Sequence, residues 1–299
     1  YCIDDVYRPF FEYESCRSYS MKLTCDADYG LADDIDQSFV EQMSEGLKQR
    51  LTAAPVRFVY DREMPACMVE KLQQRLGLTT LDSIVPGGRY HNFRDFIQFP
   101  NVGRSYLEYK KLPALNAANF DCHRNVFDAI SDGDILLHFP YHKFKYVTEF
   151  LRQSAFDPAV REIKISVYRL AKNSRIVKSL IDAVENGKKV TVFVELAARF
   201  DEEANIEWAK KLTDANVNVE FGIESLKCHS KIILVVREVE GQLIRYAHIG
   251  TGNFHERTAQ IYTDFSLFTA NQDVANEVAS VFEFLVHSYR RFDFRHLIV

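Results

Sequence analysis

The sequence predicts an α/β (α+β) protein with two parts: a small α+β domain, followed by a larger domain in which helices pack against a mixed sheet. The parts differ in proline content, because all 8 prolines lie at or before Pro158. Regular strands and helices seldom contain interior proline, so a long alternation of both is expected after it. A hydrophobic fraction of 47%, with 23 Phe and 15 Tyr, supplies sizeable cores within 299 residues.

The first part is expected to contain two helices and a strand. Apolar residues recur at helical spacing over Asp36–Leu51, and Pro65–Leu76 has the pattern of a second helix. Val56–Tyr60, between them, is expected to be a strand. Pro86-Gly87-Gly88 is expected to form a turn, since both residue types interrupt regular structure.

The pattern is interrupted again near Leu112–Ala118, by Pro113 and Asn116. We therefore expect a domain boundary there, with residues 1–112 forming the first domain and residues 113–299 the second. Neither part contains an internal repeat or a low-complexity tract, so no repeat architecture is expected.

In the second part, strands and helices alternate in the order β-α-β-α-β-β-β-α. Ser174 is a suitable N-cap for the first of these helices, and Asn186-Gly187 is a suitable end for it. A polar turn over Glu238–Gln242 separates two strands that are expected to form a hairpin. The expected strands are Ile163–Tyr168, Val190–Leu196, Val217–Phe221, Lys231–Arg237 and Leu243–Gly250. The other expected helices are Asn205–Ala215 and Asn271–Val286.

Charge and cysteine content restrict the function. With 37 Lys and Arg against 42 Asp and Glu, the net charge of −5 disfavours a general nucleic-acid coat protein but not a local basic pocket for phosphate. The 6 cysteines form no Cys-x-x-Cys pair, and such scattered cysteines are typical of the reducing cytoplasm. The longest apolar runs are too short for a membrane span, and an acidic beginning predicts no signal peptide.

The segment Lys227-Cys228-His229-Ser230-Lys231 is the strongest candidate for chemistry. At the start of a strand, residues two apart project to the same face, so His229 and Lys231 are expected side by side. A histidine that attacks phosphorus needs a nearby cation to neutralise the phosphoryl oxygens, and this pair supplies both groups. The alternative is a surface His and Lys that begin an ordinary strand.

The segment Tyr246–Phe254 places His248 at a strand end, ahead of a glycine-rich turn. Gly250 and Gly252 allow the backbone to approach an anion closely, and the Asn253 amide can donate a hydrogen bond to it. The alternative is a tight turn that needs two glycines, with His248 filling space. Two such segments on the strands of one hairpin are together more specific than either alone.

Two arginines also end expected strands, Arg169 after the first and Arg199 after the second. Ligand groups gather at strand ends in open α/β sheets, and a guanidinium matches phosphate oxygens through two-point contacts. The alternative for each is a solvated loop charge. Asp201-Glu202-Glu203 is expected to begin the next helix, where carboxylates favour the positive end of the dipole, rather than to hold a metal.

Several long motifs resemble the polyphosphate kinase family. They occur in both parts and span nearly the whole chain: Pro55–Tyr60, Ser83–Phe93, Tyr168–Leu170, Asn186–Val192, Val194–Asn205 and Arg245–Phe254. The resemblance implies a phospholipase-D-like catalytic domain after a partial head domain. In this family, a histidine takes the terminal phosphoryl group of ATP and passes it, reversibly, to polyphosphate, with Mg²⁺ as cofactor.

Carried over residue by residue, the resemblance implies that His229 is the phosphorylated nucleophile and His248 an additional essential histidine. It implies that Tyr262 contacts the nucleotide, and that Arg169 and Arg199 are associated with Mg²⁺ and phosphate. Arginine has no acceptor atom, so we expect both to clamp phosphate beside a metal held by phosphate oxygens and water. The implied partners are ATP or ADP and polyphosphate, with a homo-oligomer expected for the longer protein.

The resemblance also implies a chain that lacks two further domains, one of which supplies a second active-site histidine. We therefore expect the 299-residue chain to be inactive alone. Two other interpretations stay open. A phospholipase-D-like phosphodiesterase would fit Gly250-Thr251-Gly252-Asn253, although its His-x-Lys-x4-Asp motif is broken here by Val236. A non-catalytic module would bind polyphosphate without phosphorylation of His229.

Overall fold

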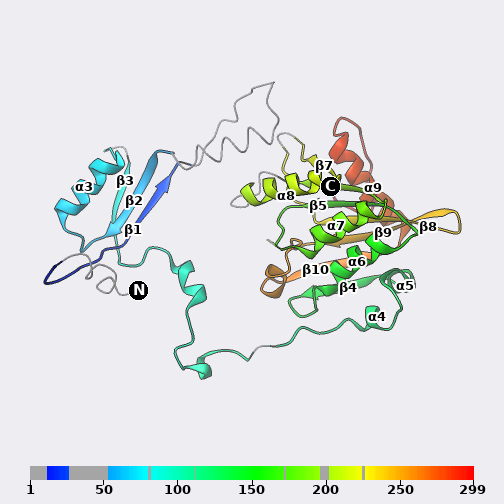
Figure 1. Cartoon of the computed structure of the whole chain (residues 1–299), viewed down its shortest axis with the longest axis horizontal. Helices are drawn as coiled ribbons and strands as arrows, with labels where there is room; N and C mark the ends of the chain where they lie inside the picture. The colour runs from blue at the N-terminus through cyan, green and yellow to red at the C-terminus, as the bar shows by residue number, and fades with distance from the viewer. Residues whose placement is uncertain are drawn as a thin grey trace. The chain divides into compact units, whose positions relative to one another are not determined.

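The computed structural model describes residues 12–26, 53–79, 82–110, 112–171, 173–195, 202–223 and 226–299. Its contacts divide the chain into two compact units, Tyr1–Tyr109 and Lys110–Val299 (Figure 1). The helix expected over Asp36–Leu51 lies outside the described residues, as does Arg199.

The first unit contains a three-stranded sheet and a helix. β2 (Pro55–Asp61) lies between β1 (Met21–Cys25), which is antiparallel to it, and β3 (Ser83–Gly87), which is parallel. The parallel pair requires a crossover, and α3 (Ala66–Leu76) provides it. The apolar face of α3 packs around Phe58, which is fully buried in β2.

The prediction of a turn at Pro86-Gly87-Gly88 is wrong for its first two residues. Pro86 and Gly87 belong to β3 and lie opposite Tyr60 and Asp61 in the parallel ladder. Proline is tolerated there because β3 is at the edge of the described sheet, where one side of the strand needs no hydrogen-bond donor. Two 3₁₀ helices, η1 (Phe93–Gln98) and η2 (Ser105–Leu107), follow β3.

The second unit contains a seven-stranded mixed sheet with the order β4-β10-β9-β8-β5-β6-β7. β5, β6 and β7 are parallel to one another, and every other neighbouring pair is antiparallel. The strands are β4 (Ile135–Phe139), β5 (Val160–Val167), β6 (Lys189–Val194), β7 (Asn218–Phe221), β8 (Ile232–Val239), β9 (Gln242–Gly250) and β10 (Asp264–Thr269). The helices are α4 (Ala118–Asp121), α5 (Val126–Asp132), α6 (Lys145–Phe156), α7 (Arg175–Glu185), α8 (Glu202–Asp214), η3 (Thr258–Gln260) and α9 (Gln272–Val286).

Helices cover both faces of this sheet (Figure 1). On one face, Ile232 and Leu234 of β8 join residues of α9 in a buried cluster. Ile233 lies between these two residues in sequence and points to the opposite face of the sheet. It is paired with His248 on β9, which is paired in turn with Phe268 on β10, so all three side chains share that face. The ring of Phe268 lies 5.6 Å from the ring of Phe150 in α6, so α6 covers this second face.

The α/β fold class and the hairpin are confirmed. β8 and β9 are joined by the two-residue turn Glu240-Gly241, in which both φ angles are positive, at 52° and 78°. Such a turn matches the twist of the flanking strands. The strands and helices expected in the second part are present with ends that differ by a few residues, whereas α4, α5, β4, α6 and β10 were not predicted. Within the described residues, no helix has the length and apolar character that crossing a membrane requires.

The expected N-cap of α7 is only partly correct. Ser174 occupies the N-cap position, but its hydroxyl makes no cap and has no hydrogen-bond partner among the described residues. Instead, the Glu256 carboxylate accepts a hydrogen bond from the Arg175 N–H at 3.1 Å. The carboxylate therefore stabilises the positive end of α7 from the loop that follows β9.

Two N-cap positions provide a matched pair for a stability test. Asn271 accepts hydrogen bonds from the first N–H groups of α9, at 3.0 and 3.3 Å. Asn271→Ala is expected to lower the free energy of unfolding by about 1 kcal/mol, because this cap is lost. Ser174→Ala is expected to change it by less than about 0.5 kcal/mol, because no hydrogen bond is lost. Chemical denaturation followed by circular dichroism measures both, and equal losses would mean that Ser174 caps α7 in solution.

Candidate active site

One edge of the seven-stranded sheet collects the residues that the sequence singles out. Because β8 runs antiparallel to β5, the amino end of β8 lies beside the carboxyl end of β5. His229 and Lys231 precede β8, and Arg169 follows β5. β9 is antiparallel to β8, so the turn that begins at Gly250 and contains Asn253 reaches the same edge.

Serine hydrogen bonds join β5 to the segment before β8. The Ser166 hydroxyl donates to the Ser230 carbonyl oxygen at 3.0 Å and accepts from the Ile232 N–H at 3.2 Å. The hydroxyl of Ser230 lies 3.0 Å from that of Ser166. These bonds fix the backbone between His229 and Lys231.

The ring of Tyr168 lies among basic side chains at this junction. The His229 ring meets it at 79°, with the two centroids 4.8 Å apart. The Lys231 ammonium is 5.1 Å from the Tyr168 centroid. The Lys227 ammonium and the central carbon of the Arg169 guanidinium each lie 5.5 Å from it. Sequence reasoning assigned no role to Tyr168, although the residue lies in one of the motifs that resemble the family and directly precedes the strand-end arginine.

These surroundings favour a neutral His229. Burial lowers the pKa of His229, and the charges of Lys231, Lys227 and Arg169 lower it further, while Glu195 acts in the opposite direction. Burial also lowers the pKa of Lys231, to about 8. A neutral imidazole has a ring nitrogen with a free lone pair, so the edge combines a nucleophile with cations that can neutralise phosphate.

Two buried polar residues hold the loop in front of His229. Glu195, directly after β6, accepts a hydrogen bond from the Cys228 N–H at 2.7 Å. The Asn205 amide, on α8, donates to the carbonyl oxygens of Tyr168 and Glu195 at 3.0 and 2.9 Å. The ends of β5 and β6 and the segment before β8 are thereby connected. Sequence reasoning missed both roles, because a carboxylate after an apolar strand and an asparagine within a helix are ordinary features.

His248 lies below this edge, inside the protein. Only 1% of it is exposed, and its ring centroid is 5.3 Å from that of Phe254 and 4.8 Å from that of Phe268. Its Nε2 atom is 2.9 Å from the Ser266 hydroxyl oxygen. Burial lowers the pKa of His248 to about 3, so this histidine is neutral near pH 7.

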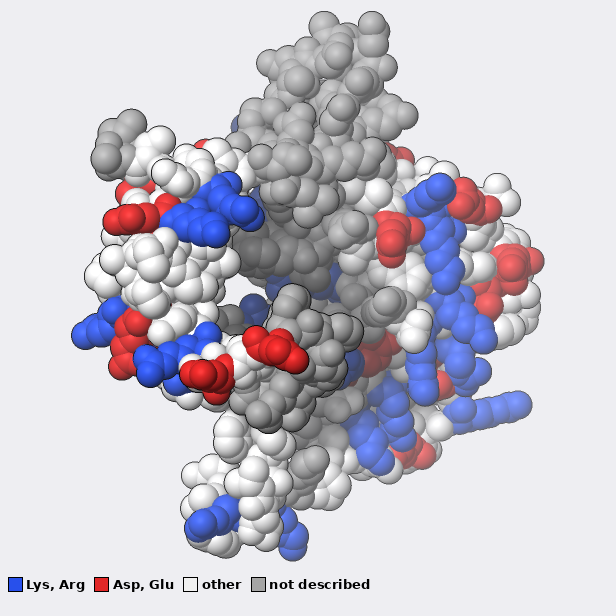
Figure 2. Space-filling view, turned by 60° about the vertical axis from the view of Figure 1, so that its left-hand side comes forward, with Lys and Arg blue, Asp and Glu red and all other residues white. Residues whose placement is uncertain are grey.

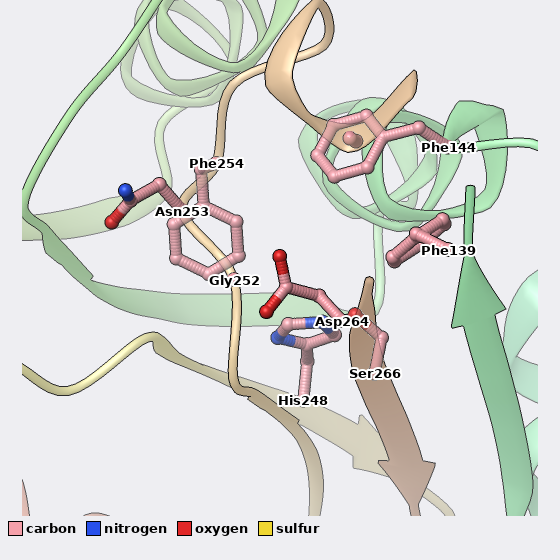
Figure 3. Close-up of a pocket in the computed structure, with 9 residues that line it drawn as sticks. Phe139, Phe144, His248, Gly252, Asn253, Phe254, Asp264 and Ser266 are labelled. Atoms are coloured by element: carbon pink, nitrogen blue, oxygen red, sulfur yellow. Dashed lines mark hydrogen bonds between the residues drawn. The ribbon is translucent and has the colours of Figure 1, made fainter. Parts of the chain in front are cut away.

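A small cavity adjoins His248 (Figure 3). Its volume of about 10 Å³ has room for roughly one water molecule, not for a nucleotide. In Figure 3, the Asn253 amide points away from the His248 ring. The residues that line the cavity are Phe139, Phe144, His248, Gly252, Asn253, Phe254, Ala259, Asp264 and Ser266.

The glycine-rich turn is shaped by Asp264, at the start of β10. A Cβ atom on Gly252 would lie 2.5 Å from the Asp264 carboxylate, so only glycine permits this approach without a shift. The Thr251 hydroxyl donates to the same carboxylate at 2.8 Å. In the structure, Gly252 permits the close approach of a carboxylate of the protein itself, and its approach to a bound anion stays a prediction.

The remaining candidates are placed differently. Tyr262 is 63% exposed on the loop before β10. Arg199 lies outside the described residues, so its position relative to Arg169 is not part of this geometry. α8 begins at Glu202, as the helix interpretation of Asp201-Glu202-Glu203 requires.

The described residues contain no protein-held metal site. No group of three or more His, Cys, Asp or Glu side chains among them could hold a metal ion. Arg169 has five N–H donors and no acceptor, so it cannot be a ligand. On the face shown in Figure 2, Lys and Arg form a band on the right-hand side, with acidic side chains on both sides of it.

The buried His248 predicts a pH dependence of stability. Its folded pKa of about 3 lies below the value of about 6.5 expected when unfolded, so between these values only the unfolded chain binds the proton. The contribution of His248 to the free energy of unfolding is therefore complete above about pH 6.5. It decreases by about 1.4 kcal/mol for each pH unit below that value. His248→Gln is expected to remove this contribution. Denaturation between pH 6 and 4.5 measures it, and an unchanged slope would mean that folded His248 accepts a proton.

Comparisons with known proteins agree across both units. The family model described as "Polyphosphate kinase C-terminal domain 1" matches residues 125–291, and that described as "Polyphosphate kinase middle domain" matches residues 1–99. Polyphosphate kinase of Vibrio vulnificus (strain YJ016) is 60% identical over the whole of this chain, which covers 43% of that protein. Polyphosphate kinase of Escherichia coli (strain K12) is 56% identical, again over the whole chain and 44% of that protein.

A solved structure extends the match to the fold. The crystal structure of polyphosphate kinase from Porphyromonas gingivalis aligns with a TM-score of 0.73 and 30% sequence identity. The alignment covers 98% of this chain and 41% of that one. The chain thus spans less than half the length of these relatives, and the matched families, identities and fold together show that it belongs to the polyphosphate kinase family.

Proposed function

We propose that the polyphosphate kinase containing this chain transfers the terminal phosphoryl group of ATP to polyphosphate, reversibly, through a phosphohistidine at His229. The observation that supports this most is the set of cations around a neutral His229, gathered on the Tyr168 ring. The family membership supplies the substrates, because residues alone indicate only a phosphate site with a nucleophile.

The transfer takes place in two displacements at phosphorus. A ring nitrogen of His229 attacks the terminal phosphorus of ATP, the N–P bond forms, and the P–O bond to ADP breaks. A terminal oxygen of polyphosphate then attacks the same phosphorus, and the N–P bond breaks. Lys231, Lys227 and Arg169 neutralise the charge on the phosphoryl oxygens throughout, which is the main requirement of this chemistry.

The other candidates are assigned smaller roles in this proposal. Tyr262, exposed on its loop, contacts the nucleotide, and Arg199 clamps phosphate with Arg169. His248 contributes as a buried residue that supports the Gly250–Asn253 turn, since no nitrogen of it is exposed for phosphorylation. Magnesium does not fit the described residues as a protein-held ion, so any Mg²⁺ would arrive with its phosphate oxygens and water as ligands.

One alternative enzyme class is disfavoured by a particular residue. A phospholipase-D-like phosphodiesterase would carry a carboxylate where this chain has Val236. Val236 is 6% exposed and packs in the apolar cluster under α9, so no carboxylate function is available there.

Labelling with γ-labelled ATP tests the proposed nucleophile. The full-length wild-type protein is expected to acquire an acid-labile label, and His229→Ala is expected to lose it together with polyphosphate synthesis. His287→Ala, at the end of α9, serves as the matched control and is expected to keep the label. A label that survives in His229→Ala would assign the nucleophile to another residue, and a wild type without label would favour a binding module.

The isolated 299-residue chain is expected to bind nucleotide or polyphosphate weakly and to turn over little. It provides His229, two lysines, Arg169 and Arg199, which is only part of a shell around a transferred phosphoryl group. Loss of a single preorganised donor typically costs about 10²–10³ in rate, so loss of several should nearly abolish activity. A polyphosphate synthesis assay comparing it with the full-length enzyme decides this, and similar rates would mean that the remaining domains are not needed for the chemistry.

A further inference from the structure

Three cationic side chains lie close together at the candidate active site and repel one another. Lys231 is only 4% exposed and Arg169 is half-buried, whereas Lys227 is exposed, and all three side chains lie around the same ring. Like charges that converge in a partly desolvated place repel one another. Among the described residues, no carboxylate lies within ion-pair distance of the Lys227 or Lys231 ammonium. The Asp264 charge nevertheless acts on Lys231, and the Lys231 ammonium donates a hydrogen bond to the His229 carbonyl oxygen at 2.5 Å.

An aromatic face is suited to hold cations in a site that must also accept phosphate. A carboxylate partner would fix a lysine, but it would cancel the charge and repel the incoming anion. The face of an aromatic ring carries negative electrostatic potential without net charge, so it attracts cations and leaves their charge available. Tyr168 is 9% exposed, and this low hydration strengthens its attraction for the cations.

We propose that Tyr168 is a positioning residue for phosphoryl transfer: its ring holds Lys227, Lys231 and Arg169 and orients the His229 imidazole. This inference rests on the proposed function of His229. The role belongs to the aromatic ring and not to the hydroxyl, because the Tyr168 hydroxyl makes no hydrogen bond among the described residues. The backbone of Tyr168 is fixed separately, by the hydrogen bond from Asn205.

The backbone that carries the ring is fixed by hydrogen bonds, which a positioning residue requires. The Asn205 amide donates to the Tyr168 carbonyl oxygen at 3.0 Å and so ties the end of β5 to α8. Ser166, two residues earlier, is bonded to the Ser230 carbonyl oxygen at 3.0 Å. The ring and the imidazole therefore sit on two backbone segments that are directly connected.

The test varies the charge distribution of the ring while keeping its shape. In the full-length enzyme, Tyr168 is replaced by phenylalanine and by phenylalanine with one, two or three fluorine atoms, which progressively weaken the attraction for cations. Tyr168→Phe is expected to keep kcat within about twofold of wild type. Across the fluorinated series, kcat is expected to fall by about tenfold in total, with the KM for ATP changing by less than about threefold.

Tyr146 provides the matched control in the same unit. It is 3% exposed and carries the Lys145 ammonium 4.6 Å from its ring centroid, but it lies on α6. The same replacements at Tyr146 are expected to leave kcat per folded molecule unchanged.

The outcomes separate this inference from the proposed function. Equal kcat values across the Tyr168 series, with His229→Ala still abolishing the acid-labile label, would overturn the role of the ring and leave the nucleophile in place. A label retained in His229→Ala would overturn the proposed function itself. A fall in kcat per folded molecule of the same size with fluorination at Tyr146 would show that the effect does not depend on the position of the ring, and would also overturn the inference.

Discussion

The antiparallel pairing of β5 with β8 is the constraint on which the candidate site depends. In a sheet made only of parallel crossovers, the start of β8 would lie at the opposite edge from the end of β5. The reversal of direction places the start of one strand beside the end of the other. Ser166 secures the junction through its bonds to Ser230 and Ile232. The nucleophile candidate and the strand-end arginine come from segments far apart in sequence and meet because of this single reversal.

The protonation states of the two histidines near the junction are determined by different surroundings. His229 is exposed at the edge, yet desolvation and the nearby cations both lower its pKa and favour the neutral form that a nucleophile needs. His248 is also neutral, but only because burial excludes the charged form. Two histidines near one hairpin therefore lie in different environments: one faces the edge with cations, and the other is buried beneath the turn.

Periodicity and turn chemistry were sufficient to predict the second fold unit in outline. Apolar strands such as Val190–Leu196 and the amphipathic helix after Ser174 have strong local signals. β4 and β10 were missed because they are short, with five and six residues, and their pairing with each other and with β9 is a tertiary effect. Pro86 was misassigned because its tolerance depends on an edge position that no local pattern reveals.

Only those residues of the candidate site whose residue type itself suggests phosphate chemistry could be predicted from the sequence. His229, Lys231 and Arg169 were found because a histidine two residues before a lysine, and an arginine at a strand end, are residue types that suit phosphate chemistry. Tyr168 and Glu195 act through packing and through a backbone hydrogen bond, and both depend on strands brought together by the fold. The burial of His248 likewise depends on aromatic residues from other segments, so its position below the edge could not be read from a strand-end pattern.

Mapping the phosphorylated residue tests the central claim most directly. The full-length enzyme, incubated with ATP and digested under alkaline conditions that preserve phosphohistidine, would be analysed by mass spectrometry of its peptides. The account predicts a phosphoryl group on His229 and none on His248. A phosphoryl group on His248, or on a residue away from the junction of β5 and β8, would contradict it.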